Sequence, residues 1–313
     1  MGNILVAGSI AYDHLMTFDG AFKDSILTEK DLTHLSVSFL AKTEDFYFGG
    51  CAPNIAYGLA LLGDKPSVVG VAGSDFTKYQ RQLNDNHINT DLVDIDKENV
   101  TAAAYILTDK NQGQIAIFYP GAINNIKKGV DLHQNDYSGM WYAIVSPELP
   151  LRMAYWAMHF KSLKIPFIFD PGQAIPALSK EQMSKIVESA DGMIFNEYEA
   201  VMIEEKTGLN IADLALKMRF VIRTLGADGC ECHEGGHVHK IPAITNIKVV
   251  DSTGCGDSFR SGFMHGITNG FSIKRACEMG CTTSSFAIEV KGTQNHRYTL
   301  DEFNSRLIKH YGK

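Results

Sequence analysis

A glycine-rich segment that ends in a carboxylate is the part of the sequence best suited to chemistry. The segment DSTGCGDSF spans residues 251–259 and places Gly254 and Gly256 just before Asp257. Glycines allow backbone N–H groups to converge at the start of a helix, where unpaired donors and the helix dipole favour an anion. A carboxylate beside a bound phosphate can accept the proton of an attacking hydroxyl group, as phosphoryl transfer requires. The simpler alternative is a strand, a turn and a helix in which the aspartate is a favourable N-terminal residue.

The residues around this segment predict the elements that would position it. The apolar run KVV predicts a strand that ends at Val250, and we expect the helix to begin near Asp257. Phe259 and Phe263 recur at helical spacing and predict a buried stripe, and an Asn-Gly pair ends the helix. The segment lacks the Gly-Lys-Ser/Thr of a P-loop, so the anion site would be of a different type.

Two further segments offer polar groups suited to a sugar. FGGCAPNIAYGLALLG (48–63) pairs Gly49 and Gly50 with Asn54, and GSIAYD (8–13) places Asp13 after a predicted strand. Adjacent glycines allow the backbone to approach a ligand closely. An amide donates and accepts hydrogen bonds and a carboxylate accepts them, so the two side chains match vicinal hydroxyl groups. Neither segment alone identifies a site.

Short apolar runs that alternate with helical patterns predict a parallel sheet. The runs end in small or polar residues and occupy residues 3–9, 67–73, 142–146, 166–170, 192–196 and 220–225. Helical patterns lie between several of them, such as 54–62 and 181–190. Continuous apolar strands covered by helices on both faces are typical of α/β proteins. Ligands bind beyond the carboxyl ends of such strands, so we expect the site there.

Two stretches, residues 12–48 and 100–120, interrupt this alternation. The first mixes polar and apolar residues without a long helical period, and the second contains TAAAYILTD and QIAIFYP around the turn KNQG. The second pattern is typical of a hairpin with a glycine-containing loop. We expect both stretches to form a small β-sheet lid over the strand ends. An ordinary edge hairpin is the alternative.

The composition excludes several classes of protein. The 313 residues allow one large α/β domain with an insert, or two domains. The net charge is -7, from 29 basic and 36 acidic residues, and it gives no indication of a positively charged surface for nucleic acid or an anionic membrane. No apolar run approaches the ~18 residues of a spanning helix. The first basic residue is Lys23, so the start lacks the basic region of a targeting peptide. We expect a cytoplasmic protein.

The cysteines are too sparse for a disulfide scaffold, but some of them lie close to histidines. The segment CECHEGGHVHK contains Cys230, Cys232, His233, His237 and His239. Such side chains can hold zinc. Alternation around the Gly-Gly pair instead predicts a β-hairpin, and C-x-C is not the common zinc spacing. The hairpin is favoured, and metal binding by residues 230–239 stays open.

Together the motifs resemble those of the ribokinase-like (PfkB) carbohydrate kinase family along essentially the whole chain. FGGCAPN is similar to the family's first signature and DSTGCGDSF to its second. GVAGSDF (70–76) is similar to the family's Gly-x-x-Gly-x-Asp turn, NEYE (196–199) to its Asn-x-x-Glu motif and TLGADG (224–229) to its nucleotide loop. The resemblance implies an α/β fold with a ribokinase-like, parallel-type central sheet flanked by helices. It also implies a small β-sheet lid and a single kinase domain over residues 1–313.

The resemblance implies a role for each matching residue. Asp257 would be the catalytic base, beside an anion hole for the transferred phosphoryl group formed by Gly254, Cys255 and Gly256. The ribose-like part of the acceptor would be held by Asp13, Gly49, Gly50 and Asn54. The nucleotide site would be lined by Thr224, Gly226 and Gly229. Mg²⁺ and its waters would be organised by Asn196 and Glu199, with Glu199 acting through water. A capping box at the start of a helix is the alternative for this last pair.

Departures from the family pattern indicate which branch of the family the sequence resembles. Ala11 stands where ribokinases carry an Asn that binds ribose, Cys255 replaces a common Ala, and Arg260 follows the second signature. These features resemble the adenosine and nucleoside kinase branch. The predicted lid also carries three aromatic side chains that could stack on a purine: Phe46, Phe48 and Phe118. Packing of these rings within the lid is the alternative.

We therefore predict an ATP- and Mg²⁺-dependent kinase that transfers the γ-phosphate to the 5′-hydroxyl of a nucleoside, adenosine first. One alternative is a sugar kinase for a ribose- or fructose-like substrate. Another is a catalytically silent regulator that binds a nucleoside or sugar. The expected partners are small molecules, with no nucleic acid and no membrane. An edge strand of the lid could also pair with a second subunit to form a homodimer.

Overall fold

The computed structural model describes residues 3–25, 37–111, 113–134, 137 and 141–313. Across these residues the strands form a nine-stranded sheet and a separate four-stranded sheet. From edge to edge the large sheet contains β13 (His237–Ile241), β12 (Cys230–Glu234), β11 (Phe220–Thr224), β10 (Gly192–Asn196), β9 (Phe167–Phe169), β8 (Trp141–Val145), β1 (Asn3–Ala7), β4 (Pro66–Gly73) and β5 (Val93–Asp96). Neighbours from β11 to β5 are parallel, and β12 is antiparallel to β11 and β13. The predicted parallel-type central sheet is confirmed.

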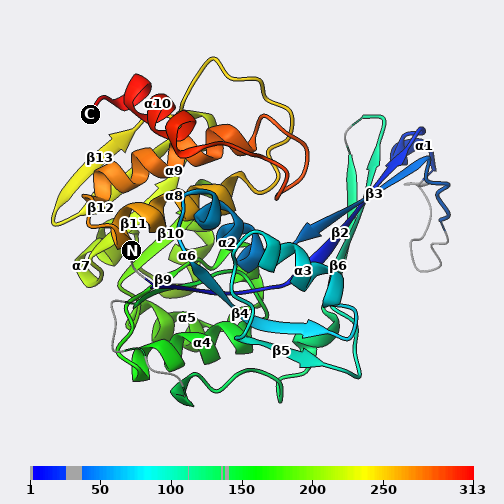
Figure 1. Cartoon of the computed structure of the whole chain (residues 1–313), viewed down its shortest axis with the longest axis horizontal. Coiled ribbons are helices and arrows are strands. Elements are labelled where there is room, and N and C mark those ends of the chain that lie inside the picture. The colour runs from blue at the N-terminus through cyan, green and yellow to red at the C-terminus, as the bar shows by residue number, and fades with distance from the viewer. Residues whose placement is uncertain (1–2, 26–36, 112, 135–136, 138–140) are drawn as a thin grey trace.

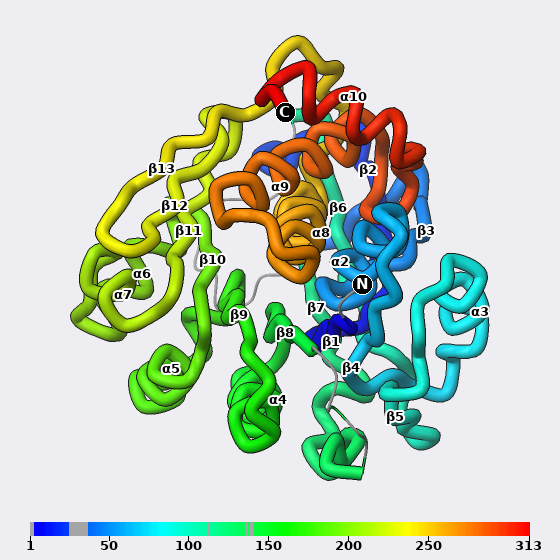
Figure 2. The backbone as a smooth tube through the Cα atoms, turned by 60° about the vertical axis from the view of Figure 1, so that its left-hand side comes forward, coloured from blue at the N-terminus to red at the C-terminus, as the bar shows by residue number. Residues whose placement is uncertain are grey.

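Helices cover both faces of the large sheet because its strands are apolar on both sides. In β1, Ile4 and Val6 join one core, whereas Leu5 and Ala7 join another. The first core includes side chains of α2 (Cys51–Leu61), α3 (Thr77–Asp85), α8 (Cys255–Thr268) and α9 (Ile273–Ala287). The second includes side chains of α4 (Pro150–Ser162), α5 (Lys180–Val187), α6 (Glu197–Thr207) and α7 (Ile211–Lys217). Figure 2 shows α8 and α9 on one side of the strands and α4 and α5 on the other. The last helix, α10 (Leu300–Tyr311), packs on α9.

The four-stranded sheet projects from one side of this body (Figure 1). Its order is β3 (Thr43–Gly49), β2 (Ala11–Phe18), β6 (Ala102–Asp109) and β7 (Gln114–Tyr119). β2 runs parallel to β6 and antiparallel to β3, and a short helix, α1 (Phe22–Ser25), follows β2. Apart from the ends of β2 and β3, these strands lie within the stretches 12–48 and 100–120 where we expected the lid. Residues 26–36 of the first stretch lie outside the described residues.

One predicted strand is wrong. Residues 242–254 form neither helix nor strand, so no strand ends at Val250, whereas α8 begins at Cys255, close to the predicted start near Asp257. The apolar residues of this connection have another use. Val249 is 68% exposed and lines a cavity, and Val250 N–H bonds the carbonyl of Ile288 at 2.8 Å. An apolar run that lines a pocket cannot be told from a short buried strand by its pattern alone.

The predicted hairpin at residues 230–239 is confirmed, because β12 and β13 pair across the Gly235–Gly236 turn. Cys230 and Cys232 both point into the core and are 1% and 0% exposed. Within the described part of the chain, the Cys and His side chains of the hairpin bring no three ligand atoms within 4.8 Å of one another. The geometry therefore does not support the zinc alternative at this hairpin. None of the helices formed by the described residues combines the length and apolar character needed to cross a membrane.

Candidate active site

A cavity of about 540 Å³, which we call the polar cavity, lies beyond the carboxyl ends of the central strands. Residues at or just after the ends of five strands line it: Ser9, Pro147, Asp170, Asn196 and Thr224. The start of α8 contributes Gly254, Gly256 and Asp257. The lid contributes Asp13, Ala104 and Phe118. The site thus lies at the sheet edge where ligands of parallel α/β proteins are expected.

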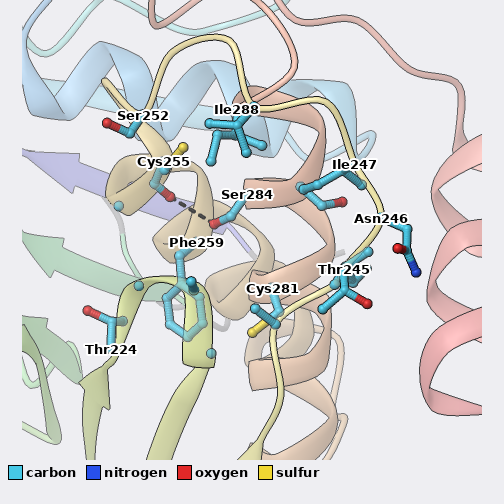
Figure 3. A pocket seen from close by; sticks show the side chains of 18 residues that line it. Thr224, Thr245, Asn246, Ile247, Ser252, Cys255, Phe259, Cys281, Ser284 and Ile288 are labelled. Carbon is cyan, nitrogen blue, oxygen red and sulfur yellow. Dashed lines mark hydrogen bonds between the residues drawn. The ribbon is translucent and has the colours of Figure 1, made fainter.

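A second cavity of about 540 Å³, which we call the apolar cavity, is shown in Figure 3. It adjoins the polar cavity. Its apolar walls include Ile244, Ile247, Val249, Phe259 and Ile288. Gly229 and Cys255 also line it, and Ser284 Oγ donates to the carbonyl of Cys255 at 2.8 Å, which ties α9 to the start of α8. The two cavities share three lining residues: Thr224, Gly226 and Gly256. They therefore meet at the first turn of α8.

The first turn of α8 has no side-chain cap. Its N-cap, Gly254, has a φ of 75°, and a Cβ atom there would lie 2.9 Å from Thr293 Cγ2. Glycine adopts this left-handed conformation without steric cost. The first amide groups of a helix have no partner within the helix, and here no side chain replaces one. The amides of Gly256 and Asp257 belong to this first turn and lie at the wall of the polar cavity, in the position that favours an anion.

The carboxylate of Asp257 is held by a hydrogen-bonded chain from other elements. Asn54 Nδ2 donates to Asp257 Oδ2 at 2.9 Å, and Gln294 Nε2 donates to Asn54 Oδ1 at 2.8 Å. Gln294 Nε2 also lies 2.6 Å from the hydroxyl of Tyr79, whose proton goes to the carbonyl of Gly49 at 2.7 Å. Desolvation raises the pKa of Asp257 to about 7, although the bond from Asn54 acts in the opposite direction. A carboxyl group with this pKa can exchange a proton near neutral pH.

A buried ion pair between Arg260 and Asp170 contacts the first turn of α8. Arg260 Nε and Nη2 donate to the two carboxylate oxygens of Asp170 at 2.5 and 2.8 Å, and Arg260 Nη1 donates to the carbonyl of Gly256 at 3.1 Å. The two charged residues are 7% and 1% exposed. Burial alone would lower the pKa of Arg260, but contact with Asp170 raises it. Arg260 therefore stays charged and joins the end of β9 to the anion site.

The lid brings two predicted acceptor-binding residues to the polar cavity. Asp13 lies on β2, and desolvation raises the pKa of its carboxyl group to about 6. Gly49 is not in the cavity wall, but it leaves room for this carboxylate, since a Cβ atom there would lie 2.2 Å from Asp13 Oδ2. Gly50 and Asn54 line the cavity directly. Phe118, on β7, lines it from the lid side and is 51% exposed.

The other two candidate aromatics contact rings of the protein, although Phe46 is 44% exposed. The ring of Phe46 lies 5.1 Å from the ring of Tyr12, and the ring of Phe48 stacks on Tyr79 at 4.5 Å. Neither belongs to the wall of the polar cavity. Of the three aromatics that the sequence offers for stacking on a purine, only Phe118 lines the polar cavity.

The start of α6 also faces the polar cavity, but side chains cap it. Asn196 Oδ1 accepts the N–H of Glu199, and Glu199 Oε2 accepts the N–H of Asn196, both at 2.8 Å. This is the capping box that the sequence allowed as an alternative. Both residues nevertheless line the polar cavity. Burial, and then the charge of nearby Asp170, raise the pKa of Glu199. The cap and a ligand-binding role are therefore compatible.

Sequence reasoning missed three polar residues of this site. Asp170 ends the apolar run 166–170, so its position beyond a strand was a usable signal. Gln173 lines the polar cavity a few residues later without belonging to any motif. Gln294 holds Asn54, which is 240 positions away along the chain, so only the folded structure reveals the contact.

The fold and the site together are those of an α/β kinase. The site combines a helix start without a side-chain cap, a carboxyl group beside it, and two adjoining cavities, of which the polar cavity is also lined by residues of the lid. The chain matches the pfkB family of carbohydrate kinases over residues 12–299, and it belongs to that family. The predictions of a ribokinase-like fold and of a phosphotransferase with an alcohol group as acceptor are thereby confirmed.

Individual relatives are similar over nearly the whole chain. The nucleoside kinase of Methanocaldococcus jannaschii is 32% identical over 268 residues, which cover 84% of this chain and 86% of that protein. The structure of Burkholderia thailandensis nucleoside kinase in complex with inosine has a TM-score of 0.88 and 32% identity, and covers 99% of this chain and 98% of that one. Its complex with ADP-inosine has a TM-score of 0.85 and 33% identity, with 99% and 96% covered.

Proposed function

We propose that this protein transfers the γ-phosphate of ATP to the 5′-hydroxyl group of a nucleoside, with adenosine as the preferred acceptor. The observation that carries the proposal is the position of Asp257, between an anion site and Asn54, where the two cavities meet. The similarity to a nucleoside kinase whose structures contain inosine and ADP supports a nucleoside acceptor and an adenine nucleotide. The choice of adenosine among nucleosides rests on the resemblance of the sequence to the adenosine and nucleoside kinase branch. In this assignment the nucleoside occupies the polar cavity and the adenine of ATP occupies the apolar cavity.

The chemistry assigned to the chain centres on one proton and one developing charge. Asp257 accepts the proton of the 5′-hydroxyl as its oxygen bonds to the γ-phosphorus, and ADP leaves with the electrons of the broken P–O bond. The amides at the start of α8 stabilise the charge on the transferred group, and Gly254, Cys255 and Gly256 shape that turn. Arg260 is engaged with Asp170 and the carbonyl of Gly256, so we assign it to holding the turn in place.

The start of α6 fits a magnesium ion held through water. Glu199 and Asp170 both supply carboxylates to the polar cavity, the ligand type that Mg²⁺ prefers. The raised pKa of Glu199 is what a carboxylate without a sufficient counter-charge would have. Glu199 and Asn196 would orient the waters of the ion, which when bound neutralises charge on the phosphates of ATP. Thr224, Gly226 and Gly229 would line the path of the nucleotide between the cavities.

The acceptor assignment follows from the groups around the polar cavity. Asp13 accepts hydrogen bonds and Asn54 can donate a second one, so the pair suits two neighbouring ribose hydroxyls. Gly50 allows the backbone close to the sugar, while Phe118 offers an aromatic face to the base. Gln173 places an amide in the same cavity.

The test is ATP-dependent phosphorylation of a panel: adenosine, inosine, guanosine, cytidine, 2′-deoxyadenosine, ribose and fructose. We expect the highest kcat/KM for adenosine, and a value at least about tenfold lower for 2′-deoxyadenosine because polar groups would be left unpaired. A higher value for inosine than for adenosine would overturn the preference but keep the class. A higher value for ribose or fructose would establish a sugar kinase. Binding of a nucleoside and ATP without turnover of any compound would establish a regulator.

We also propose that the lid pairs with the lid of a second copy. β7 is an edge strand of the four-stranded sheet, and its Ile117 and Tyr119 are 64% and 47% exposed. An edge strand with exposed apolar side chains is a template for pairing with another strand. Light scattering should give the mass of a dimer for the wild-type protein and of a monomer for Ile117→Lys. A monomeric wild-type protein would refute the proposal.

A further inference from the structure

Three side chains that can bind metal meet at the end of α4 that is remote from the polar cavity. Asp131 precedes a 3₁₀ turn (Leu132–Gln134), His133 lies within that turn, and His159 lies in the last turn of α4. One ligand atom from each of the three side chains lies within 4.8 Å of the other two. Pro147 lines the polar cavity just before α4, and His159 lies about 14 Å along the helix from its first residue. The cluster is therefore separate from the kinase site.

Hydrogen bonds determine which ring nitrogen of each neutral histidine carries the proton. His159 Nδ1 lies 3.2 Å from the carbonyl of Tyr155, which can only accept, so Nδ1 is protonated and Nε2 keeps its lone pair. Ser162 Oγ donates its one proton to the carbonyl of His159 at 2.8 Å. Towards His133 Nε2, at 3.3 Å, the same oxygen can then only accept. His133 Nε2 is therefore protonated, and its Nδ1 keeps a lone pair.

The carboxylate of Asp131 is also held in place. Its Oδ1 accepts the backbone N–H of His133 at 3.0 Å, which orients the side chain within the turn. The rings of His133 and His159 lie 5.3 Å apart, centre to centre. Histidines that bind metals usually donate their second ring N–H to a carbonyl or another polar group, which fixes the tautomer and the ring. Both histidines have such a partner here.

We propose that Asp131, His133 and His159 bind a divalent transition-metal ion, with zinc as the best match. Two imidazoles and a carboxylate suit zinc and its neighbours rather than magnesium, and water would complete a tetrahedral site. Ligand atoms around tetrahedral zinc are about 3.3 Å apart, so the three ligand atoms, which lie within 4.8 Å of one another, would approach by up to about 1.5 Å when the ion binds. The ion would fasten the turn before β8 to the end of α4. Bound there, it stabilises the fold and leaves the phosphoryl-transfer site untouched.

The test is a calorimetric titration of tag-free, full-length protein with zinc chloride. We expect one strong site in the wild-type protein and binding at least about tenfold weaker in His159→Ala and in His133→Ala. Asp131→Asn retains an oxygen for the N–H of His133, so weaker binding by this variant would show that the carboxylate charge itself contributes. His310→Ala, at an exposed position of α10, is the matched control and should bind zinc as the wild type does.

Three results would decide against the site, and a fourth would decide against its stabilising role. Wild-type protein that binds no zinc at millimolar concentration would overturn the proposal, as would undiminished binding in both histidine variants. Loss of binding in Cys230→Ser, with retention in His159→Ala, would move the ion to the β12–β13 hairpin. A zinc-induced rise in melting temperature that is the same in His159→Ala and the wild type would exclude the stabilising role. Kinase activity measured without zinc should be equal in His159→Ala and the wild type, which shows that the variant is folded.

Discussion

Of the helices that begin at the polar cavity, α6 and α8 use their first turns in opposite ways. At the start of α6, Asn196 and Glu199 cap each other's backbone amides, so the helix satisfies its own donors. At the start of α8, Gly254 offers no side chain, and the carboxylate of Asp257 is bonded to Asn54 on another helix. The first arrangement contributes to folding. The second leaves backbone donors for a ligand, which is how a site differs from a structural turn.

The two starts also differ in what they contribute to stability. Folding raises the pKa of Asp257 from 3.8 to about 7. The contribution of this carboxyl group to the stability of the folded state is therefore fully present below pH ~4 and is lost as the pH rises through about 7. At neutral and higher pH the charged form is buried at a cost. The cap at α6 recovers part of such a cost for Glu199, because its carboxylate accepts a backbone hydrogen bond. We therefore expect the start of α8, which belongs to the proposed site, to contribute less to stability at neutral pH than the capped start of α6 does.

The largest effect is expected from Asp257→Asn. The amide has nearly the same shape and can still accept a bond from Asn54, but it cannot act as a base. We expect kcat to fall by ~10²–10⁴-fold, the usual contribution of general-base catalysis, with little change in nucleoside affinity. Steady-state kinetics and calorimetric titration with the nucleoside measure the two effects.

Stability measurements on the same variant distinguish loss of function from loss of folding. Because the substitution removes a buried charge, the melting temperature at pH 8 should equal or exceed that of the wild type. A loss of kcat below about tenfold would be too small for a base, and phosphoryl transfer would then depend on positioning and electrostatics alone. A markedly lower melting temperature would assign the carboxylate to folding and remove the contrast with α6.

The next largest effect should come from the ion pair beneath α8. Asp170→Asn leaves Arg260 buried without its counter-charge, so we expect the free energy of unfolding to fall by about 3 kcal/mol or more. Asp170 also raises the pKa of Asp257, whereas Arg260 lowers it. Removing the Asp170 charge should therefore lower the pKa of Asp257 and shift the pH dependence of kcat/KM to lower pH.

Urea unfolding and pH–rate profiles test the ion-pair prediction. The exposed pair Lys185–Glu181 on α5 provides the control, because Glu181→Gln should change neither stability nor rate measurably. If Asp170→Asn unfolds like the wild type and shows the same pH midpoint, then the pair does not support the turn.

A smaller and more selective effect is expected from Glu199→Gln. Gln182 already occupies the same place in the capping box of α5, so a glutamine at 199 should preserve the cap and the melting temperature. The lost charge should raise the Mg²⁺ concentration needed for half-maximal rate by several-fold or more. Glu302→Gln in the capping box of α10, away from both cavities, is the control. Unchanged Mg²⁺ dependence together with a lower melting temperature would leave Glu199 a structural cap only.

Much of the fold could be predicted because the relevant patterns are local. Apolar runs that end in polar residues mark the strands and the edge where ligands bind, and glycines mark the turns. The run before Asp251 was misinterpreted as a strand because its valines are apolar for a different reason: Val249 lines a cavity. Pattern alone does not reveal what an apolar side chain faces.

The candidate site was predictable only in part, because its residues depend on contacts between distant segments. Asp257 and Asn54 were found through their motifs, and the fold brings them within 2.9 Å. Gln294 and Arg260 act through partners 240 and 90 positions away, and no local spacing encodes these partners. The Asn196–Glu199 pair shows a second limit. The same two side chains cap α6 and line the polar cavity. The capping interpretation and the ligand-binding interpretation of this motif therefore do not exclude each other.

The central claim is that Asp257 is the catalytic base and that its surroundings raise its pKa. The pH dependence of kcat/KM, measured with saturating ATP and Mg²⁺, tests this claim most directly. Because the base must be deprotonated, and because its pKa is raised to about 7, kcat/KM should rise with pH and level off above that value. The residual rate of Asp257→Asn should lack this ionisation. A wild-type profile that is flat from pH 5 to 9, or a rise of the same midpoint in Asp257→Asn, would contradict the claim.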